Sequence, residues 1–411
     1  MTPNELLQEV SGDSEELDLY EPVRFRRRTR SNPQCSFNEF LHALKTNETI
    51  ERIHCHTVFI ESISADEWIR LIQVMRSLKR LEALCFHCSS RVPMMALAEA
   101  VRNPSLRNLC FGHDITLLGD PDTGREALAL SLRESTLEDF AWLGDFSEQH
   151  IHSLTPLLYG LAASPSIQKV KLGYDSTTTH ALRYLIRSDS LKELQLVASG
   201  EHWLAVADEM QQGNSHIQSL VLSAHFGSDE CDKAAAALAN AIRVNGSLEN
   251  LVLRMCNGYT DAAVAELAAA IQMNTHLCQV DLSTNLCSST EKSYMGFKAF
   301  GALRKMLIVR TNLDLTLPDP CLDENPTSAT LEQHGLMRIE MGMNAVGRGQ
   351  LLGHTDRAIW VDALGKVNAK MGTGSELDDV QVDCLYELLL LNPSVCQSVG
   401  PIAVVPDYPK G

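Results

Sequence analysis

Five histidine and cysteine residues in the N-terminal third are the side chains best suited to metal chemistry. His54 and His56 are two residues apart, as are Cys85 and His87, and Cys110 belongs to a third segment. Residues two apart on a β-strand point to the same face, so the five would project together from three neighbouring strands. Thiolate and imidazole are ligands that zinc prefers, but the close C-x₂-C and H-x₃₋₅-H pairs of structural zinc sites are missing. We therefore predict a binding surface without metal, and a zinc site at these five residues is the alternative.

Signatures of common enzyme classes are absent from the sequence. It contains no G-x-x-x-x-G-K-[ST] phosphate loop, no H-E-x-x-H zinc motif and no G-x-S-x-G nucleophile turn. We predict that the protein is not an enzyme and uses no cofactor.

The segments that carry the histidines and cysteines belong to a repeated pattern of three apolar residues with the spacing of L-x-x-L-x-L. The pattern occurs nine times, at Ile50-Ile53-Cys55, Leu81-Leu84-Phe86, Leu106-Leu109-Phe111, Leu137-Phe140-Trp142, Ile167-Val170-Leu172, Leu191-Leu194-Leu196, Ile217-Leu220-Leu222, Leu248-Leu251-Leu253 and Leu277-Val280-Leu282. Between the triplets, apolar residues recur at helical spacing, as at Val264, Leu267, Ala268 and Ile271. Each unit is thus predicted to be a strand followed by a helix, and one unit must stack on the next to bury its apolar face.

The triplets, together with Cys256 and Asn285 at the ninth position of two of them, resemble leucine-rich repeats of the ribonuclease-inhibitor type. This resemblance implies an α/β solenoid with a parallel concave sheet, outer helices and a C-terminal helical cap. The stretches IEMGMNAVGRG, RAIWVDALGKVN and DCLYELLLLNPSVC are similar to a segment that follows such repeats in uncharacterised algal proteins. Because the repeat fold supports many unrelated binding roles, the resemblance implies binding without naming the ligand.

Composition changes along the chain predict four regions. Residues 1–36 are expected to be a disordered arm with an acidic run and the basic run Arg24–Arg30, followed by the solenoid at 37–320. Residues 329–397 are expected to form three helices, and residues 398–411 a disordered tail. Near the end of the solenoid, Ile308-Val309 and the alternating Leu313-Leu315-Leu317 predict one or two further strands.

The formal net charge of −17 argues against a general binder of nucleic acid or of anionic membranes. No run of about 18 apolar residues predicts a transmembrane helix, and the first residues do not resemble a secretory signal. We expect a cytoplasmic protein with reduced cysteines, and nuclear import through Arg24–Arg30 is the alternative. The oligomeric state is left open.

The residues between the apolar positions of each triplet should line the concave strand face, which we predict binds a protein or peptide. Twelve are selected: Arg52, His54, His56, His87, Asp139, Lys169, Lys171, Glu193, Gln195, Asn250, Arg254 and Asp281. The alternative function is a substrate receptor of a ubiquitin ligase or a regulator of small GTPases. It would require a second partner site, either on residues 330–397 or on the convex side.

Overall fold

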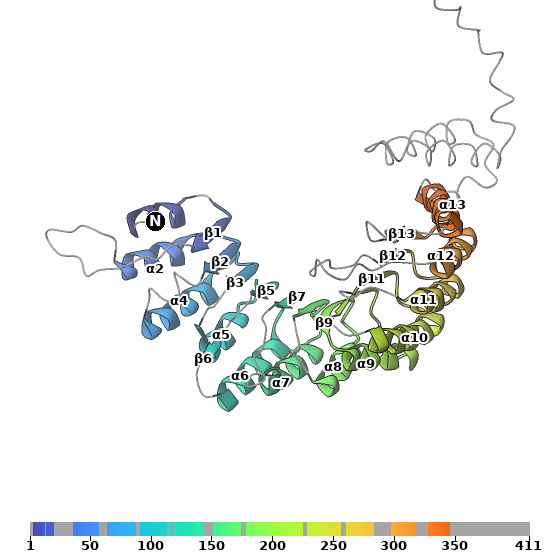
Figure 1. Ribbon diagram of the computed structural model, residues 1–411. Coiled ribbons are helices and arrows are strands. Elements are labelled where there is room, and N and C mark those ends of the chain that lie inside the picture. The colour runs from blue at the N-terminus through green and yellow to red at the C-terminus, as the bar shows by residue number, and fades with distance from the viewer. Residues whose placement is uncertain are drawn as a thin grey trace, which may run out of the picture. The chain divides into compact units, whose positions relative to one another are not determined.

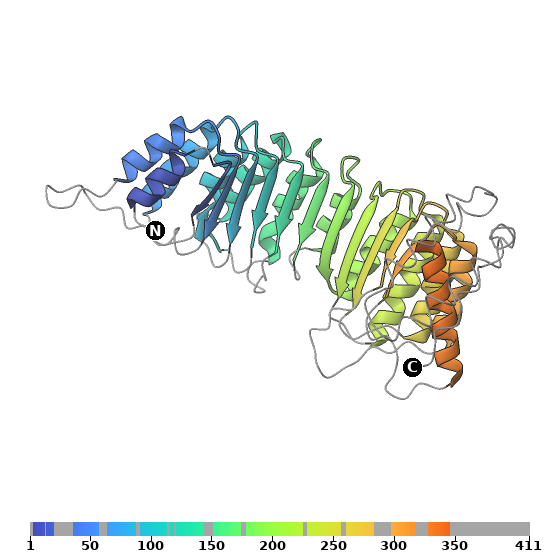
Figure 2. The same ribbon diagram turned by 90° about the horizontal axis from the view of Figure 1, so that it is seen from above.

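The computed structural model describes residues 3–12, 14–19, 36–56, 64–87, 91–112, 116–118, 121–143, 151–173, 178–224, 228–255, 260–282, 297–317 and 328–345. These residues belong to two compact units. Unit 1 contains residues 1–226 and 240–248, and unit 2 contains residues 227–239 and 249–411. Each unit alternates strands with helices, and within it the helices cover one face of a sheet (Figures 1 and 2).

Unit 1 has a parallel sheet whose strands follow one another in chain order, apart from a separate pair that flanks it. The strands of the sheet are β1 (Glu16–Leu19), β2 (Arg52–His56), β3 (Ala83–His87), β5 (Asn108–Phe111), β7 (Asp139–Trp142), β8 (Lys169–Leu172), β9 (Glu193–Ala198) and β10 (Ser219–Ala224). The separate parallel pair is β4 (Arg91–Pro93) and β6 (Thr116–Leu118). The helices are α1 (Pro3–Val10), α2 (Phe37–Thr46), α4 (Ala65–Ser77), α5 (Met94–Val101), α6 (Pro121–Glu134), α7 (Ile151–Ala162), α8 (Thr179–Ile186) and α9 (Gly200–Gln211).

Unit 2 repeats the arrangement with fewer strands. Its strands are β11 (Asn250–Met255), β12 (Gln279–Asp281) and β13 (Asp314–Thr316), paired in parallel in that order. Its helices are α11 (Asp261–Met273), α12 (Phe297–Val309) and α13 (Ser328–Ala345), and the unit boundary falls within α10 (Ser228–Val244). Helix α13 packs on α12 and β13, so it covers the end of the array as the predicted cap should. Among the described helices, none is long and apolar enough to cross a membrane.

All nine predicted triplets lie on or beside strands of these sheets. Every one of their 27 side chains exposes at most 2% of its surface, and in unit 1 the buried positions alternate with accessible ones along the strands. Rings from successive units contact each other in the core, as where Phe86 stacks on Phe111 with a centroid distance of 5.4 Å. The protein is therefore a leucine-rich-repeat solenoid, and within each unit a parallel sheet and a layer of helices bury an apolar layer between them.

Two sequence-based expectations were wrong. Residues 1–36 are not wholly disordered, because α1 packs on α2 and β1 pairs with β2. Leu17 and Leu19 are 1% exposed, so burial of apolar side chains offsets the acidic composition of this segment. Ile308 and Val309 end helix α12 instead of forming a strand. The run Arg24–Arg30, the two later helices expected within 329–397 and the tail 398–411 lie outside the described residues.

Backbone hydrogen bonds fix the register between successive repeats. The carbonyl of Glu51 accepts bonds from the N–H groups of Glu82 and Ala83, with N···O distances of 2.7 and 3.0 Å. The carbonyl of Glu82 accepts two bonds from the next repeat in the same way. This forked contact recurs in both units and places each strand beside its predecessor without a shift.

Buried asparagine side chains close the turn between each helix and the next strand in several repeats. Asn103 is 1% exposed, and its amide donates to the carbonyls of Met75 and Leu78 in the preceding repeat, both at 2.9 Å. Its side-chain oxygen accepts from the N–H of Ser105 at 2.8 Å. Asn47, Asn245 and Asn274 accept from following N–H groups in the same way, whereas other repeats use serine. These side chains satisfy polar groups that water cannot reach.

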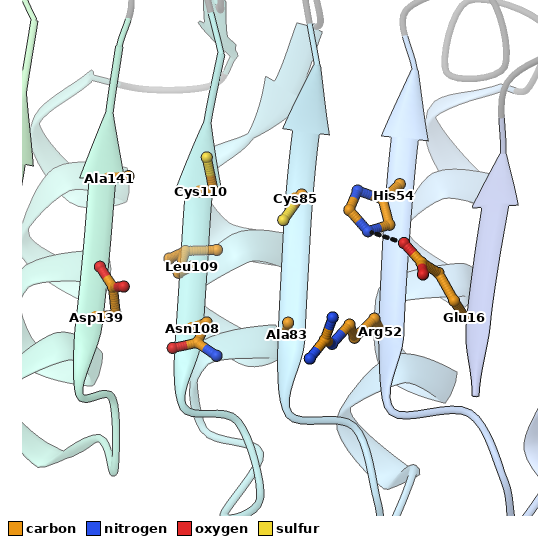
Figure 3. A pocket seen from close by; sticks show the side chains of 10 residues that line it. All are labelled: Glu16, Arg52, His54, Ala83, Cys85, Asn108, Leu109, Cys110, Asp139 and Ala141. Atoms are coloured by element: carbon orange, nitrogen blue, oxygen red, sulfur yellow. Dashed lines mark ion pairs between the residues drawn. The ribbon is translucent and has the colours of Figure 1, made fainter. Parts of the chain in front are cut away.

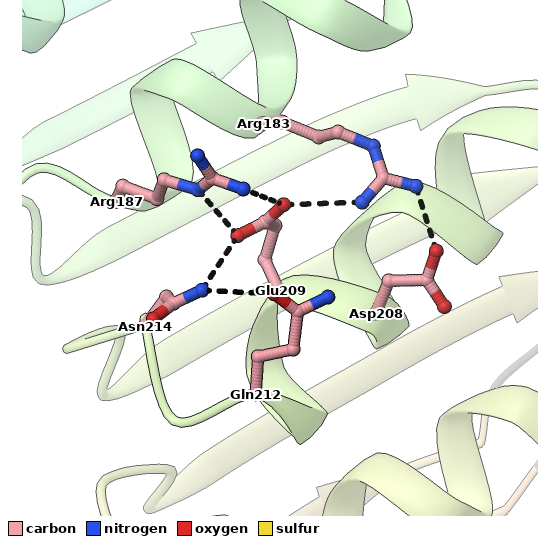
Figure 4. Close-up of polar contacts among 6 residues, drawn as sticks. All are labelled: Arg183, Arg187, Asp208, Glu209, Gln212 and Asn214. Carbon is pink, nitrogen blue, oxygen red and sulfur yellow. Dashed lines mark hydrogen bonds and ion pairs between the residues drawn. The ribbon is translucent and has the colours of Figure 1, made fainter.

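A buried carboxylate joins α8 to α9 (Figure 4). The Glu209 side chain is 0% exposed and accepts hydrogen bonds from Arg183 at 3.0 Å, from Arg187 at 2.6 and 2.8 Å, and from Asn214 at 3.2 Å. The hydrogen bonds from Arg187 do most to lower the pKa of Glu209 below its usual range, and burial opposes this effect. Because Arg183 also pairs with the half-exposed Asp208, the network holds α8 and α9 together.

Replacing Glu209 by Gln should lower the free energy of unfolding by about 2 kcal/mol, because a neutral amide cannot accept charge-assisted bonds from both arginines. The loss stays below the 3–5 kcal/mol of a fully buried pair, because the arginines reach solvent and can hydrate. Urea unfolding of the full chain measures it. Asp208→Asn is the matched control and should cost at most about 1 kcal/mol, since that carboxylate is half exposed.

Acid should remove the contribution of Glu209. Its pKa is lowered in the folded protein, so its stabilisation is present above the ordinary value of 4.5 and is lost as the pH falls through the folded pKa. The stability difference between wild type and Glu209→Gln should therefore shrink as the pH is taken below 4.5. A difference that stays constant from pH 7 to pH 3 would show that the charge of Glu209 does not stabilise the fold.

Replacing Asn103 by Ala should destabilise unit 1 by roughly 2 kcal/mol, because two buried carbonyls and one N–H group lose their partner. Thermal and urea unfolding measure the change. Gln211→Ala is the matched control, because it removes an exposed amide from the end of α9 and should change stability by less than about 0.5 kcal/mol. Equal losses for the two variants would contradict a role for the buried amide.

Candidate functional site

The accessible positions of the strands in unit 1 form columns across the open face of the sheet. In one column Arg52, Ala83, Asn108, Asp139, Lys169, Glu193 and Ser219 follow one another in register. In the next column the order is His54, Cys85, Cys110, Ala141, Lys171, Gln195 and Val221. Seven of the residues predicted to bind a partner lie in these two columns: Arg52, His54, Asp139, Lys169, Lys171, Glu193 and Gln195. His56 lies on the same face, two residues beyond His54 on β2.

The other predicted binding residues are not part of these two columns. His87 lies opposite His56 in the register, but its side chain is outside the described part of the chain. Asn250, Arg254 and Asp281 belong to unit 2, where Asn250 is opposite Gln279 and Asp281 is opposite Val252. They occupy half-buried positions of that unit's strands.

A hollow of about 340 Å³ lies over the first five strands of unit 1. Figure 3 shows the side chains that line it, which come from β1, β2, β3, β5 and β7. The lining residues are Glu16, Arg52, His54, Ala83, Cys85, Asn108, Leu109, Cys110, Asp139 and Ala141. The hollow exists because Ala83 and Ala141 have small side chains. Charged side chains line it on both sides, with Glu16 and Arg52 on one side and Asp139 on the other (Figure 3). This volume is at the lower limit of small-molecule pockets, and it suits one or two side chains of a partner.

Two thiols lie side by side within this hollow. Cys85 and Cys110 are register partners on β3 and β5, and both side chains line the hollow. The neighbouring Cys110 thiol, together with burial, raises the pKa of Cys85. The neighbouring Cys85 thiol and the positive charge of Lys171 lower the pKa of Cys110, and burial opposes this effect. The hollow therefore contains two adjacent, partly buried thiols.

A second hollow of about 240 Å³ adjoins the first and shares Asp139 with it. Lys169 forms an ion pair with Glu193 at 2.8 Å, which raises the pKa of Lys169. Burial raises the pKa of Asp139, although Lys169 opposes this effect. Lys171 is two residues after Lys169 on β8 and lies on the same face of the sheet. Its register neighbours are Ala141 and Gln195. The second hollow thus offers both charge signs within a short distance.

The five residues of the alternative zinc site do not converge as far as the structure describes their side chains. Among its members with described side chains (His54, His56, Cys85 and Cys110), no three place donor atoms within 4.8 Å of one another. Glu16, Asp18 and His54 do meet that distance. Sequence reasoning missed the two carboxylates because it assigned their segment to a disordered arm, although the alternation in ELDL was a signal of a strand.

The pKa of His56 lies below its usual value, because burial outweighs the opposing charge of Asp18 and His54 adds to the lowering. His56 is therefore mainly neutral at pH 7. The open face combines a neutral imidazole, thiols, a lysine and carboxylates, which can donate and accept hydrogen bonds without a single-sign field. Such a surface can bind both the backbone and the charged side chains of a partner.

Comparison with known proteins gives the following matches. No family model matches the chain, and no curated protein matches it either. Among solved structures, the leucine-rich repeat-containing protein LegL7 from Legionella pneumophila has 15% identity and a TM-score of 0.42, covering 78% of this chain and 97% of its own. A chain of the Rad7 and Elc1 complex in yeast has 12% identity and a TM-score of 0.43, covering 80% of this chain and 82% of its own. The assignment of the fold rests on the repeats of this chain itself.

Proposed function

We propose that the protein is a non-catalytic interaction module whose open strand face in unit 1 binds a protein or peptide segment. The observation that carries the proposal is the pair of adjoining hollows, which share Asp139 and are lined by residues in register. A partner crossing the strands could place one side chain in each hollow. Since these side chains stand on rigid neighbouring strands, little ordering is needed when the partner binds.

The charges of the two hollows suggest which partner groups would fit. Lys169 and Glu193 already neutralise each other, so a partner would gain little by replacing either of them. Asp139 and Lys171 lie on neighbouring strands, and neither forms an ion pair with the described residues. A segment with a hydrogen-bond donor or cation opposite Asp139 and an acidic group opposite Lys171 would fit this arrangement.

Three further parts of the proposal concern the type of repeat, the class of partner and the alternative function. We infer repeats of the ribonuclease-inhibitor type from the full helices between the strands, and a cytoplasmic protein partner instead of nucleic acid or membrane from the net charge of −17. The residues of unit 2 (Asn250, Arg254 and Asp281) would add a further contact surface. A role as a ubiquitin-ligase receptor or small-GTPase regulator would need a partner site on the convex side or within 330–397, most of which lies outside the described residues.

The double variant Asp139→Ala with Lys171→Ala should reduce capture of a partner at least about tenfold, because both hollows lose a polar contact at their centre. Affinity capture from native extract, quantified by mass spectrometry against wild type, measures the loss. The control Asp66→Ala with Lys79→Ala removes the same two residue types from exposed positions away from the open face and should retain every partner.

Circular dichroism should show that both double variants remain folded, since none of the four side chains is fully buried. Partners that bind wild type and the Asp139/Lys171 variant equally would place binding elsewhere on the protein. Partners lost equally from the control would show that the open face is not specific.

A further inference from the structure

Strand β1 brings two carboxylates to the edge of the open face beside a histidine of β2. Glu16 and Asp18 are two residues apart on β1 and point to the same face. In the parallel register Asp18 lies directly opposite His54. The intervening Leu17 and the following Leu19 are buried, so the strand that carries the carboxylates is fixed on the sheet. Rigid neighbouring strands are a suitable support for a coordination site.

The donor atoms of these residues converge. Nε2 of His54 is 2.8 Å from Oε1 of Glu16, and one oxygen of each acid and a ring nitrogen of His54 lie within 4.8 Å of one another (Figure 3 shows Glu16 and His54). Ligands at about 2.1 Å from a tetrahedral zinc ion are roughly 3.4 Å apart. Shifts of about 1 Å in two flexible carboxylate side chains would therefore complete this geometry.

The local charge is also suited to a cation. Glu9 of α1 adds a third carboxylate near Asp18. Asp18 forms no ion pair with any part of the chain that the structure describes, and Glu16 pairs with His54, which carries a charge only when protonated. A bound dication would neutralise the two carboxylates, which one imidazole cannot do.

We propose that Glu16, Asp18 and His54 form a binding site for a divalent cation of the zinc type. One nitrogen and two oxygen donors suit Zn²⁺, which accepts His and carboxylate ligands together. Ca²⁺ takes six to eight oxygen ligands and is disfavoured by the imidazole. Glu16 and His54 are 53% and 21% exposed, so water would complete the coordination shell.

Binding at this site would join the N-terminal strand to the repeat array. The ligands come from both β1 and β2, so the cation would crosslink two strands that otherwise pair through four register positions. Because β1 covers the edge of β2, the cation would also protect the backbone groups of that edge from pairing with another chain. Glu16 and His54 line the same hollow as Asp139, so the cation would lie at the edge of the surface proposed to bind a partner.

The test is isothermal titration calorimetry of the full chain, without a histidine tag, against zinc chloride and calcium chloride. Wild type should bind zinc at this site, and His54→Gln and Asp18→Asn should each weaken that binding at least about tenfold. Zinc should also slow proteolysis of the N-terminal segment in wild type but not in His54→Gln. The second variant and the proteolysis readout keep the test valid if one substitution disturbs folding.

Two control variants separate this site from other zinc ligands. His216→Gln removes a histidine that faces a single carboxylate, Asp189, at 3.2 Å. Cys85→Ser with Cys110→Ser removes the thiol pair. Both controls should bind zinc as wild type does. The proposal is overturned if wild type binds no zinc, if His54→Gln and Asp18→Asn bind it unchanged, if the thiol variant loses it, or if calcium binds as tightly as zinc.

Discussion

The forked backbone hydrogen bond between successive repeats is the constraint on which the rest of the structure depends. In unit 1 the carbonyl just before each of the strands β1, β2, β3, β5, β7, β8 and β9 accepts two N–H groups from the following repeat, as Glu138 does from Gln168 and Lys169. This contact leaves each strand beside its predecessor with no shift in register, although the repeats differ in length. The variable segments therefore change the loops and helices, while the alignment of side chains across the sheet is preserved.

The fixed register between strands determines which side chains lie next to each other on the open face of the sheet. One side of each strand is covered by helices and takes the apolar triplets, so the residues between them stand together on the other side. Cys85 and Cys110 are 25 positions apart in the chain but become neighbours in the register, and Lys169 and Glu193 meet across strands as an ion pair. The chemistry of the open face thus follows from the identity of single residues at equivalent positions of different repeats.

This explains which features the sequence could predict. Burial of the triplets and the columns between them follow from periodicity alone, so the register of His54 with Cys85 was predictable before any coordinates. The contacts of β1 were not predictable in that way, because composition favoured disorder and only a short ELDL alternation opposed it. Ile308 and Val309 were assigned to a strand because β-branched residues favour strands, whereas packing of α12 on its neighbours decides the outcome. The contact between Glu16 and His54 depends on the length and conformation of both side chains, and sequence periodicity does not predict these.

The distribution of charge separates structural from binding roles within the same fold. Glu209 is buried among helices and surrounded by two arginines and an asparagine, so its bonding capacity is used within the protein. Asp139 is only partly buried at the meeting point of two hollows, and burial raises its pKa because nearby cations do not fully compensate. A carboxylate in that condition gains from a donor supplied by a partner, whereas Glu209 has nothing to gain. The incomplete compensation at Asp139 therefore supports the proposal, already based on the two adjoining hollows, that this part of unit 1 binds a partner.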